Sequence, residues 1–389
     1  MKHATPSRMQ GLDTLRSLAI VAVMFFHVSG RLPDRLSAIA QFGWMGVDMF
    51  FVLSGYLIGS QLLKLYRAGE RPRLWDFYRR RLFRILPAYL AVLALYFLLP
   101  VWREQPGISP LWQFLTFTEN LFVDYANNEA FSHVWSLCVE EHFYLLLPLL
   151  VLWLSRKAAL WKTVSLISFF VALGIGIRAY ELIHVLRPLS LTDDGFGVRY
   201  IERIYYPTYT HLDGLLAGVG LALIRIFRPG WWSAASRHGH ALFLSGAGLV
   251  GLCPWLFLHR FESVTGVEAV GTVIGFPLLA VGLVLLAASS ISSNGWLARM
   301  RVPGAKLVAT LAFSLYLTHK EVMHLDRQFL PGMESKGVVL TLLIYAITCM
   351  AAAAVLYLCV ERPFMMLRDR GMRRKGTDPE LEALREPAL

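Results

Sequence analysis

The sequence predicts an all-α polytopic membrane protein, with about ten transmembrane helices and both termini in the cytoplasm. Hydrophobic residues make up 56% of the 389 residues and charged residues only 17%, whereas globular proteins are about 45–50% apolar. The mean hydropathy is +0.50. Apolar runs of roughly 20 residues, long enough to cross a bilayer, recur along the chain. An ordinary soluble protein, a disordered chain and a disulfide scaffold are therefore excluded.

Ten apolar runs are the predicted spans, of which the third and fifth are the shortest. In order they are Leu12–Ser29, Phe42–Leu63, Ile85–Pro100, Val134–Leu154, Val164–Ile177, Tyr206–Phe227, Ala241–Leu258, Ala269–Ala288, Leu307–Met323 and Val338–Val360. The first run contains a histidine and lacks a small-residue cleavage site, so we interpret it as a retained helix and not as a signal peptide. Gly55 and Gly59 in the second span predict close helix packing.

Basic residues set the predicted orientation. With the N-terminus in the cytoplasm, 27 of the 38 lysines and arginines fall on the cytoplasmic side, as the positive-inside rule requires. The net charge of +11 therefore marks orientation in a membrane, and we expect no nucleic-acid partner. Residues 1–368 form one predicted membrane domain, and residues 369–389 a charged, disordered cytoplasmic tail. Six acidic residues fall on the outer side: Glu104, Glu119, Asp124, Glu129, Asp193 and Asp194.

Several common site motifs are missing from the sequence. The four cysteines lie in apolar stretches without CxxC spacing, so we expect packing residues and no metal site. The chain contains no GxSxG elbow, no Walker P-loop and no HExxH. Serine-nucleophile, ATP-driven and zinc-hydrolase chemistries therefore lack support.

The first span carries Arg16 and His27. They are 11 residues apart, which places them on one helix face, about 16 Å apart along the axis. Arg16 is thus expected near the cytoplasmic surface and His27 near the bilayer midplane. Ionisable residues at that depth are usually functional, unless the arginine snorkels and the histidine is simply hydrogen-bonded in the core.

The fourth span carries a polar stripe of His133, Ser136, Glu140 and Tyr144. Spacings of three, four and four put these side chains on one helix face. The stripe is either a hydrogen-bonded seam between helices or part of a site. Other ionisable residues fall in the middle or outer half of further spans, namely Asp48, His211, Asp213 and His319. Contributions from five spans at similar depth predict a shared cavity.

The predicted cytoplasmic loop from Lys64 to Arg84 is strongly basic and ends on Arg79-Arg80-Arg81-Leu82-Phe83-Arg84. Such a loop can anchor the protein to anionic lipid. Guanidinium groups also suit phosphate oxygens, so the same arginines could hold a nucleotide-bearing substrate. The residues alone leave both interpretations open.

The sequence resembles the acyltransferase-3 family of integral membrane O-acyltransferases over nearly the whole chain. The resemblance rests on several motifs in order: Leu12-Asp13-Thr14-Leu15-Arg16 running to His27, Gly46 to Ile58, Arg81 with Arg84, Trp135-Ser136-Leu137 with Glu140 and Tyr144, Ser314-Leu315-Tyr316-Leu317-Thr318-His319, and Glu361-Arg362-Pro363. His211, Thr318 and Lys320 depart from the family pattern.

The resemblance implies transfer of an acyl group, commonly acetyl, from cytosolic acyl-CoA to a hydroxyl of a glycan or lipid-linked saccharide. Acyl-CoA would be a cosubstrate, with no permanently bound cofactor, and homo-oligomerisation stays open. On this view Arg16, Arg81 and Arg84 hold the CoA phosphates. Acceptor or cavity residues would be Asp48, Ser136, Tyr144, His211, Asp213, Tyr316 and His319.

His27 is the expected catalytic residue, either as the general base for the acceptor hydroxyl or as a covalent acyl carrier. Glu140 is expected to orient or charge an imidazole. A transporter or flippase of a sugar-linked lipid is the alternative, because translocation paths also gather polar residues around a midplane cavity. That alternative does not explain why arginines cluster in a single loop.

Overall fold

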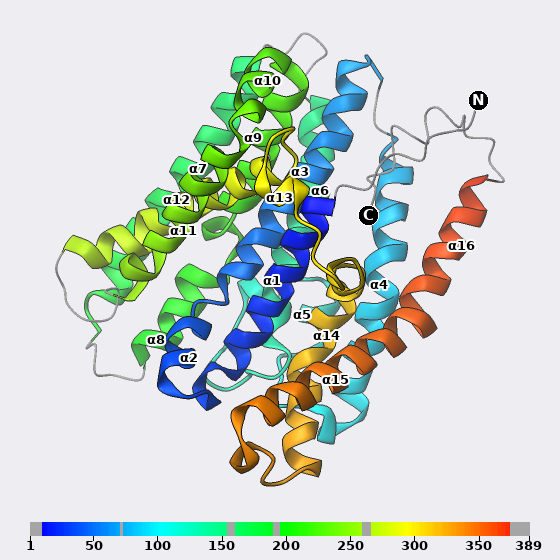
Figure 1. Ribbon diagram of the computed structural model, residues 1–389. Coiled ribbons are helices and arrows are strands. Elements are labelled where there is room, and N and C mark those ends of the chain that lie inside the picture. The colour runs from blue at the N-terminus through cyan, green and yellow to red at the C-terminus, as the bar shows by residue number, and fades with distance from the viewer. Residues whose placement is uncertain (1–9, 71–72, 154–159, 190–194, 259–265, 374–389) are drawn as a thin grey trace.

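The computed structural model describes residues 10–70, 73–153, 160–189, 195–258 and 266–373, and these residues are mainly helical (Figure 1). The first half contains α1 (Gln10–Val28), α2 (Asp34–Ala40), α3 (Met45–Arg67), α4 (Leu74–Leu98), α5 (Leu111–Leu115), α6 (Trp135–Trp153), α7 (Leu160–Glu181) and α8 (Gly195–Tyr200). The second half contains α9 (Asp213–Phe227), α10 (Pro229–Arg237), α11 (Gly239–Leu258), α12 (Gly266–Ser290), α13 (Trp296–Arg299), α14 (Ala305–Phe329), α15 (Val338–Leu356) and α16 (Arg362–Arg373). Within the described ranges, the β structure is one isolated bridge between Ile108 and Ala130. The all-α class is confirmed.

Eight of the described helices are long and apolar enough to cross a membrane, and a ninth span results if α9 and α10 count together. The α9–α10 pair is bent by 107°. The ninth predicted span, Leu307–Met323, corresponds to α14, which carries Lys320, Glu321 and Asp326 towards its end and is therefore less apolar. The helix α16 continues to Arg373, past the predicted start of the tail, and residues 374–389 lie outside the described residues.

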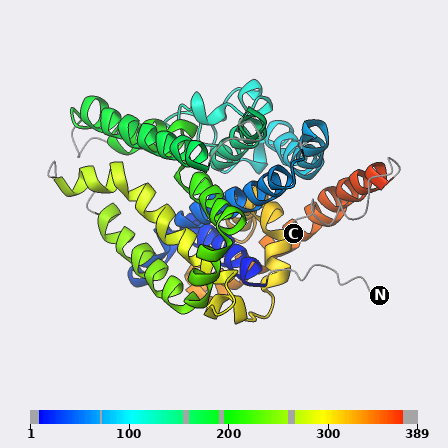
Figure 2. The same cartoon turned by 90° about the horizontal axis from the view of Figure 1, so that it is seen from above.

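The helices α1 and α3 lie near the centre of the bundle (Figure 2). The helix α3 packs closely along α9 because glycines face the partner backbone. A Cβ at Gly55 would collide with the carbonyl of Leu215, and one at Gly218 with the carbonyl of Val52. The close packing predicted for Gly55 is thus confirmed.

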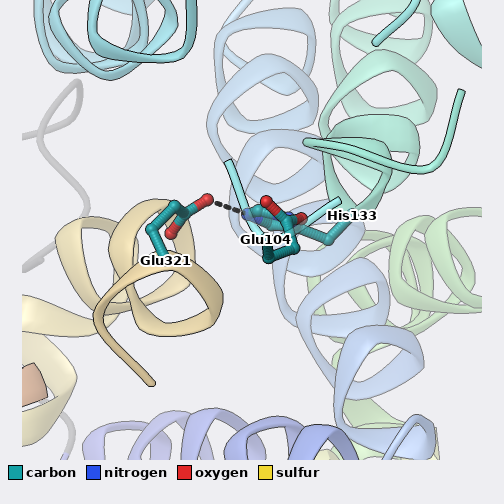
Figure 3. Close-up of side chains that lie close together, drawn as sticks. All are labelled: Glu104, His133 and Glu321. Carbon is teal, nitrogen blue, oxygen red and sulfur yellow. Dashed lines mark ion pairs between the residues drawn. The ribbon is translucent and has the colours of Figure 1, made fainter. Parts of the chain in front are cut away.

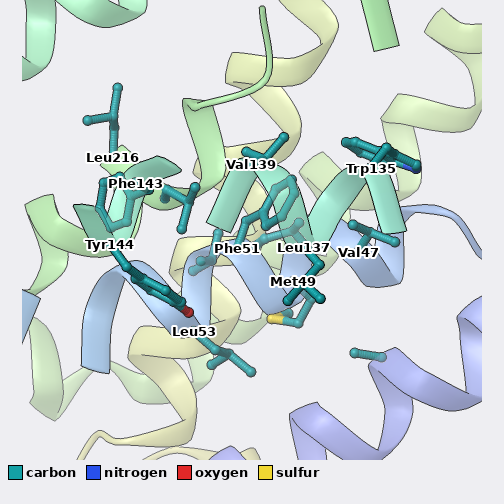
Figure 4. Packing of buried hydrophobic residues seen from close by; sticks show 14 of the residues in the cluster. Val47, Met49, Phe51, Leu53, Trp135, Leu137, Val139, Phe143, Tyr144 and Leu216 are labelled. Atoms are coloured by element: carbon teal, nitrogen blue, oxygen red, sulfur yellow. The ribbon is translucent and has the colours of Figure 1, made fainter. Parts of the chain in front are cut away.

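On another side of α3, buried residues meet α6 (Figure 4). Phe51 of α3 and Trp135 of α6 make an edge-to-face contact with ring centroids 6.0 Å apart. Aromatic pairs favour this arrangement, which adds directional preference to the burial of apolar surface. The contact holds the polar stripe of α6 against the central helices.

A buried ion pair fixes the turn that precedes α9. Arg178 of α7 is fully buried. Its guanidinium donates to both carboxylate oxygens of Asp213, at 2.6 and 3.3 Å, and to the carbonyls of Thr210 and Val273. These bonds connect α7, the turn before α9 and α12. Because surrounding lipid offers no replacement partner, the pair has to be satisfied inside the protein.

We expect Arg178→Leu to lower the free energy of unfolding by about 3–5 kcal/mol, because the substitution leaves Asp213 charged, buried and unpaired. Unfolding in detergent, followed by tryptophan fluorescence, measures the effect. Arg187→Leu is the control, since Arg187 is exposed and should change stability by less than about 0.5 kcal/mol. Equal stabilities for the two variants would contradict the structural role of Arg178.

Candidate functional site

A first cavity of about 130 Å³ lies between α1, α3, α4, α6 and α14. It is lined by all three arginines predicted to hold acyl-CoA, namely Arg16, Arg81 and Arg84. Ser136, Glu140, Tyr144 and Tyr316 line the same cavity. The structure therefore gathers seven of the predicted site residues around one space, although they come from four helices far apart in the sequence.

Contacts around this cavity order its polar side chains. Glu140 accepts hydrogen bonds from Ser54 at 3.0 Å and from Tyr144 at 2.8 Å. The Arg81 guanidinium lies over the Tyr144 ring, 4.9 Å from its centroid. Arg84 interacts electrostatically with Glu361, which accepts a hydrogen bond from Ser314 at 2.8 Å. The cavity thus presents guanidinium groups whose positions are set by packing and nearby carboxylates.

A second cavity, of about 540 Å³, contains His27 in its lining. Aromatic residues and charged residues share this lining; the charged ones are Arg31, Glu104, Glu129, Lys320 and Arg327. Val47 and Tyr316 line both cavities. The Tyr316 hydroxyl contacts the Ser136 hydroxyl at 2.6 Å and donates to the carbonyl of His133. The arginine-lined and histidine-lined spaces therefore meet at Tyr316.

The hydrogen bonds of two histidines define the protonation of His27. The Nδ1 of His319 lies 3.0 Å from the carbonyl oxygens of both Leu315 and Tyr316, so it carries a hydrogen. Its Nε2 is then an acceptor and lies 3.0 Å from Nδ1 of His27. Nδ1 of His27 is also 2.9 Å from the carbonyl of Val23, so it carries a hydrogen as well. This leaves Nε2 of His27 with a lone pair.

Among the described residues, the side-chain partner of the His27 imidazole is therefore His319. Glu140, expected to orient an imidazole, instead bonds to Ser54 and Tyr144 in the other cavity. The sequence placed His319 in the shared cavity but could not reveal the contact, because 292 residues separate the two histidines.

Glu104, His133 and Glu321 form a cluster (Figure 3), and the ring centroids of His133 and His319 are 5.4 Å apart. Donor atoms of Glu104, His133 and Glu321 lie within 4.8 Å of one another, a grouping that could hold a metal ion. The Tyr96 hydroxyl, however, contacts both carboxylates, and Lys320 forms an ion pair with Glu104 at 2.9 Å. Tyr96 and Lys320 thus satisfy part of the carboxylate oxygens, whereas both ring nitrogens of His133 and Oε2 of Glu321 have no hydrogen-bond partner among the described residues.

Three predicted acceptor residues take part in other contacts. His211 Nε2 lies 2.9 Å from Asp48 Oδ1, and Asp213 binds Arg178. None of these residues lines either of the two cavities. The sequence analysis did not predict a role for Arg178. The feature that could have indicated one is its position as a lone arginine at the end of an apolar run.

Glu119 and Glu104 were expected on the outer side of the membrane. In the structure, the side chain of Glu119 is buried and that of Glu104 is half-buried. Glu119 is fully buried, and its two carboxylate oxygens have no hydrogen-bond partner among the described residues. Burial raises the pKa of Glu119 to about 8, opposed in part by the positive charge of Lys320. The folded protein therefore holds this carboxyl in its protonated form near neutral pH.

A helical membrane bundle with a cationic cavity meeting a histidine-lined cavity defines the protein as a polytopic membrane protein with a polar interior. Residues 9–360 match the family described as an acyltransferase domain. The chain therefore belongs to the acyltransferase-3 family, and the predicted family is confirmed. No solved structure matches the chain.

Known relatives are similar over part of their length. The O-acetyltransferase OatA of Staphylococcus aureus (strain NCTC 8325) is 30% identical over 237 residues, which cover 57% of this chain and 36% of that protein. A protein of Staphylococcus aureus (strain MSSA476), provisionally named an O-acetyltransferase, is 25% identical over 343 residues, covering 83% of this chain and 52% of its own length. The matched region thus spans about a third to a half of these relatives.

The buried Glu119 predicts a pH-dependent stability. Between its ordinary pKa near about 4.3 and its folded-state pKa of about 8, the folded protein keeps a proton that the unfolded chain releases. The contribution of Glu119 to the free energy of unfolding is therefore fully present below about pH 4. It falls as the pH rises towards the folded-state pKa of about 8 and is lost above that value. We expect Glu119→Gln to flatten this decline when unfolding temperatures are measured from pH 5 to 9.

The exposed Asp34 supplies a control. The profile of Asp34→Asn should follow that of the unsubstituted protein, because this substitution leaves the buried carboxyl of Glu119 in place. If the Glu119→Gln profile also follows that of the unsubstituted protein, Glu119 is ionised in the folded protein.

Proposed function

We propose that the protein transfers an acyl group, acetyl in the first instance, from cytosolic acyl-CoA to a hydroxyl of a glycan or lipid-linked saccharide. The acceptor would lie at the outer face of the bacterial cytoplasmic membrane. Family membership and the O-acetyltransferase relatives support the reaction class. The donor and the acceptor class are our proposals.

The observation that carries the proposal is the pairing of two cavities along one bundle. Arg16 lines the first and His27 the second, about 16 Å apart by the rise of a helix. A pantetheine arm of comparable length could place its thioester beside His27 while its phosphates stay on the guanidinium groups. A binding site of this kind needs cations at one end only, which matches the distribution of arginines around the first cavity.

The chemistry assigned to His27 follows from its free Nε2 lone pair. As the acceptor oxygen attacks the thioester carbonyl, Nε2 takes the hydroxyl proton. The carbon–sulfur bond breaks as the new carbon–oxygen bond forms, and His27 returns the proton to the leaving thiolate. His319 acts as a positioning residue, since its acceptor Nε2 keeps the hydrogen of His27 on Nδ1.

Acyl transfer through His27 itself remains the alternative. The same lone pair could attack the thioester and carry the acyl group to the acceptor in a second step. Acyl-histidine trapped by rapid quenching, in the absence of acceptor, would favour this route over direct transfer.

Acyl-CoA binding is expected to depend on the arginines of the first cavity. Arg81→Gln and Arg84→Gln should each weaken the binding of labelled acetyl-CoA to the purified protein by about 10–100-fold, as expected for a lost charge-assisted hydrogen bond. Arg73→Gln is the matched control, because Arg73 precedes the same helix but is exposed and does not line the cavity. If the unsubstituted, folded protein shows no saturable binding, the proposed donor is wrong.

Turnover is expected to depend on both histidines of the pair. His27→Ala should lower acetyl transfer in membranes by about 10²–10⁴-fold, the usual contribution of a general base. His319→Leu should lower kcat by about 5–100-fold with little change in the KM for acetyl-CoA, because His27 loses a hydrogen-bond acceptor.

His319→Gln provides the rescue variant, since its amide oxygen can accept the same hydrogen bond. It should retain much more activity than His319→Leu, and nitrogen NMR of labelled histidine should still find Nε2 of His27 unprotonated. Equal kcat values for the two variants would refute the positioning role.

A further inference from the structure

A third hollow, the lateral groove, lies on the side of the bundle between α1, α14 and α15. Its volume is about 350 Å³, and apart from the Tyr345 side chain its lining is entirely apolar. Several lining side chains are open to the surroundings: Val339 is 69% exposed and Leu343 54% exposed. In a membrane, such a groove accepts hydrocarbon and excludes water-soluble groups.

The lateral groove adjoins the cavity of His27. Met323 is buried and lines both spaces. On α1, Met24 and Val28 face the groove, whereas His27 between them faces the cavity. One flexible methionine side chain thus forms the shared wall, and methionine readily adapts its shape to a neighbouring ligand.

Positive charge lies where the lateral groove approaches the cavity. Tyr345 of the groove donates to Glu334 at 3.2 Å, and Glu334 is 3.6 Å from Nε of Arg31, which lines the cavity. Tyr345 also interacts electrostatically with Arg31 and Arg327. Arg327 lines the cavity too and has no hydrogen bond or ion pair within the described part of the chain. Two guanidinium groups therefore stand at this junction, where an anionic phosphate would be favoured.

We propose that the lateral groove binds the hydrocarbon tail of a phosphate-linked lipid whose saccharide enters the cavity of His27. The inference rests on the proposed function and specifies its acceptor as lipid-linked. Hydrocarbon, phosphate and saccharide follow one another in such a molecule. Apolar groove, arginines and histidine-lined cavity follow one another in the same order in the protein.

Photo-crosslinking tests the proposal without requiring turnover. The full-length protein in phosphatidylcholine nanodiscs is irradiated with a benzophenone-bearing isoprenyl phosphate, and labelled peptides are identified by mass spectrometry. Label is expected on α1 and α15 at the groove. Leu343→Trp, which fills the groove, should reduce labelling several-fold, and Arg327→Gln should weaken apparent probe affinity about tenfold.

Two matched controls accompany these variants. Ile347→Trp places the same bulk on α15 at a position that is 67% exposed and outside the groove lining, and Arg35→Gln removes an exposed arginine outside the cavity lining. Both should label like the unsubstituted protein. Circular dichroism and size-exclusion chromatography verify that each variant is folded, and acetyl-CoA binding is measured on every sample.

Competition distinguishes a specific site from an ordinary bilayer contact. Unlabelled isoprenyl phosphate should displace the probe, and phosphatidylglycerol should not. Equal displacement by both lipids, or undiminished labelling of Leu343→Trp, would overturn the proposal. If the groove is not labelled although acetyl-CoA binds, the lipid-linked acceptor is refuted and the proposed donor is not. If the groove is labelled but acetyl-CoA does not bind, the proposed donor is refuted and the lipid-linked acceptor is not.

Discussion

Charged side chains inside this bundle are stabilised by partners within the protein, because hydrocarbon offers neither hydrogen bonds nor counterions. Arg178 with Asp213, His211 with Asp48, and Lys320 with Glu104 each join segments that are distant in the sequence. Each pair therefore restricts how helices can be arranged, in addition to the apolar packing around it. Beside these pairs, Arg81 and Arg84 line the first cavity and His27 lines the second.

The sequence was sufficient to predict the helical membrane fold, because length and hydropathy of each apolar run are local properties. From the family resemblance it also predicted that Arg16, Arg81 and Arg84 act together, and these three residues line one cavity. Glu140 was expected beside an imidazole, but it lines the arginine cavity instead. The helix α14 is the instructive case among the spans. Its polar residues lower its hydropathy, and the structure shows that these residues belong to the buried interior.

Partner choice could not be predicted from the sequence. Asp48, His211 and Asp213 have the residue types of a binding site. Only the structure reveals that His211 contacts Asp48 and that Asp213 binds Arg178. The same applies to His27, whose imidazole bonds His319 from the other end of the chain. Glu104 and Glu119 lie in an irregular segment, where no periodic pattern distinguishes a buried carboxylate from a solvated one.

The position of Tyr316 has a consequence for the energetics of the cell. A continuous water-filled channel through a membrane protein would dissipate the proton gradient. The Tyr316 side chain lines both hollows, and its hydroxyl is held by Ser136 and by the backbone of His133. Under the proposed function, this side chain would separate the two cavities, so that an acyl group could pass between them without a continuous path for ions.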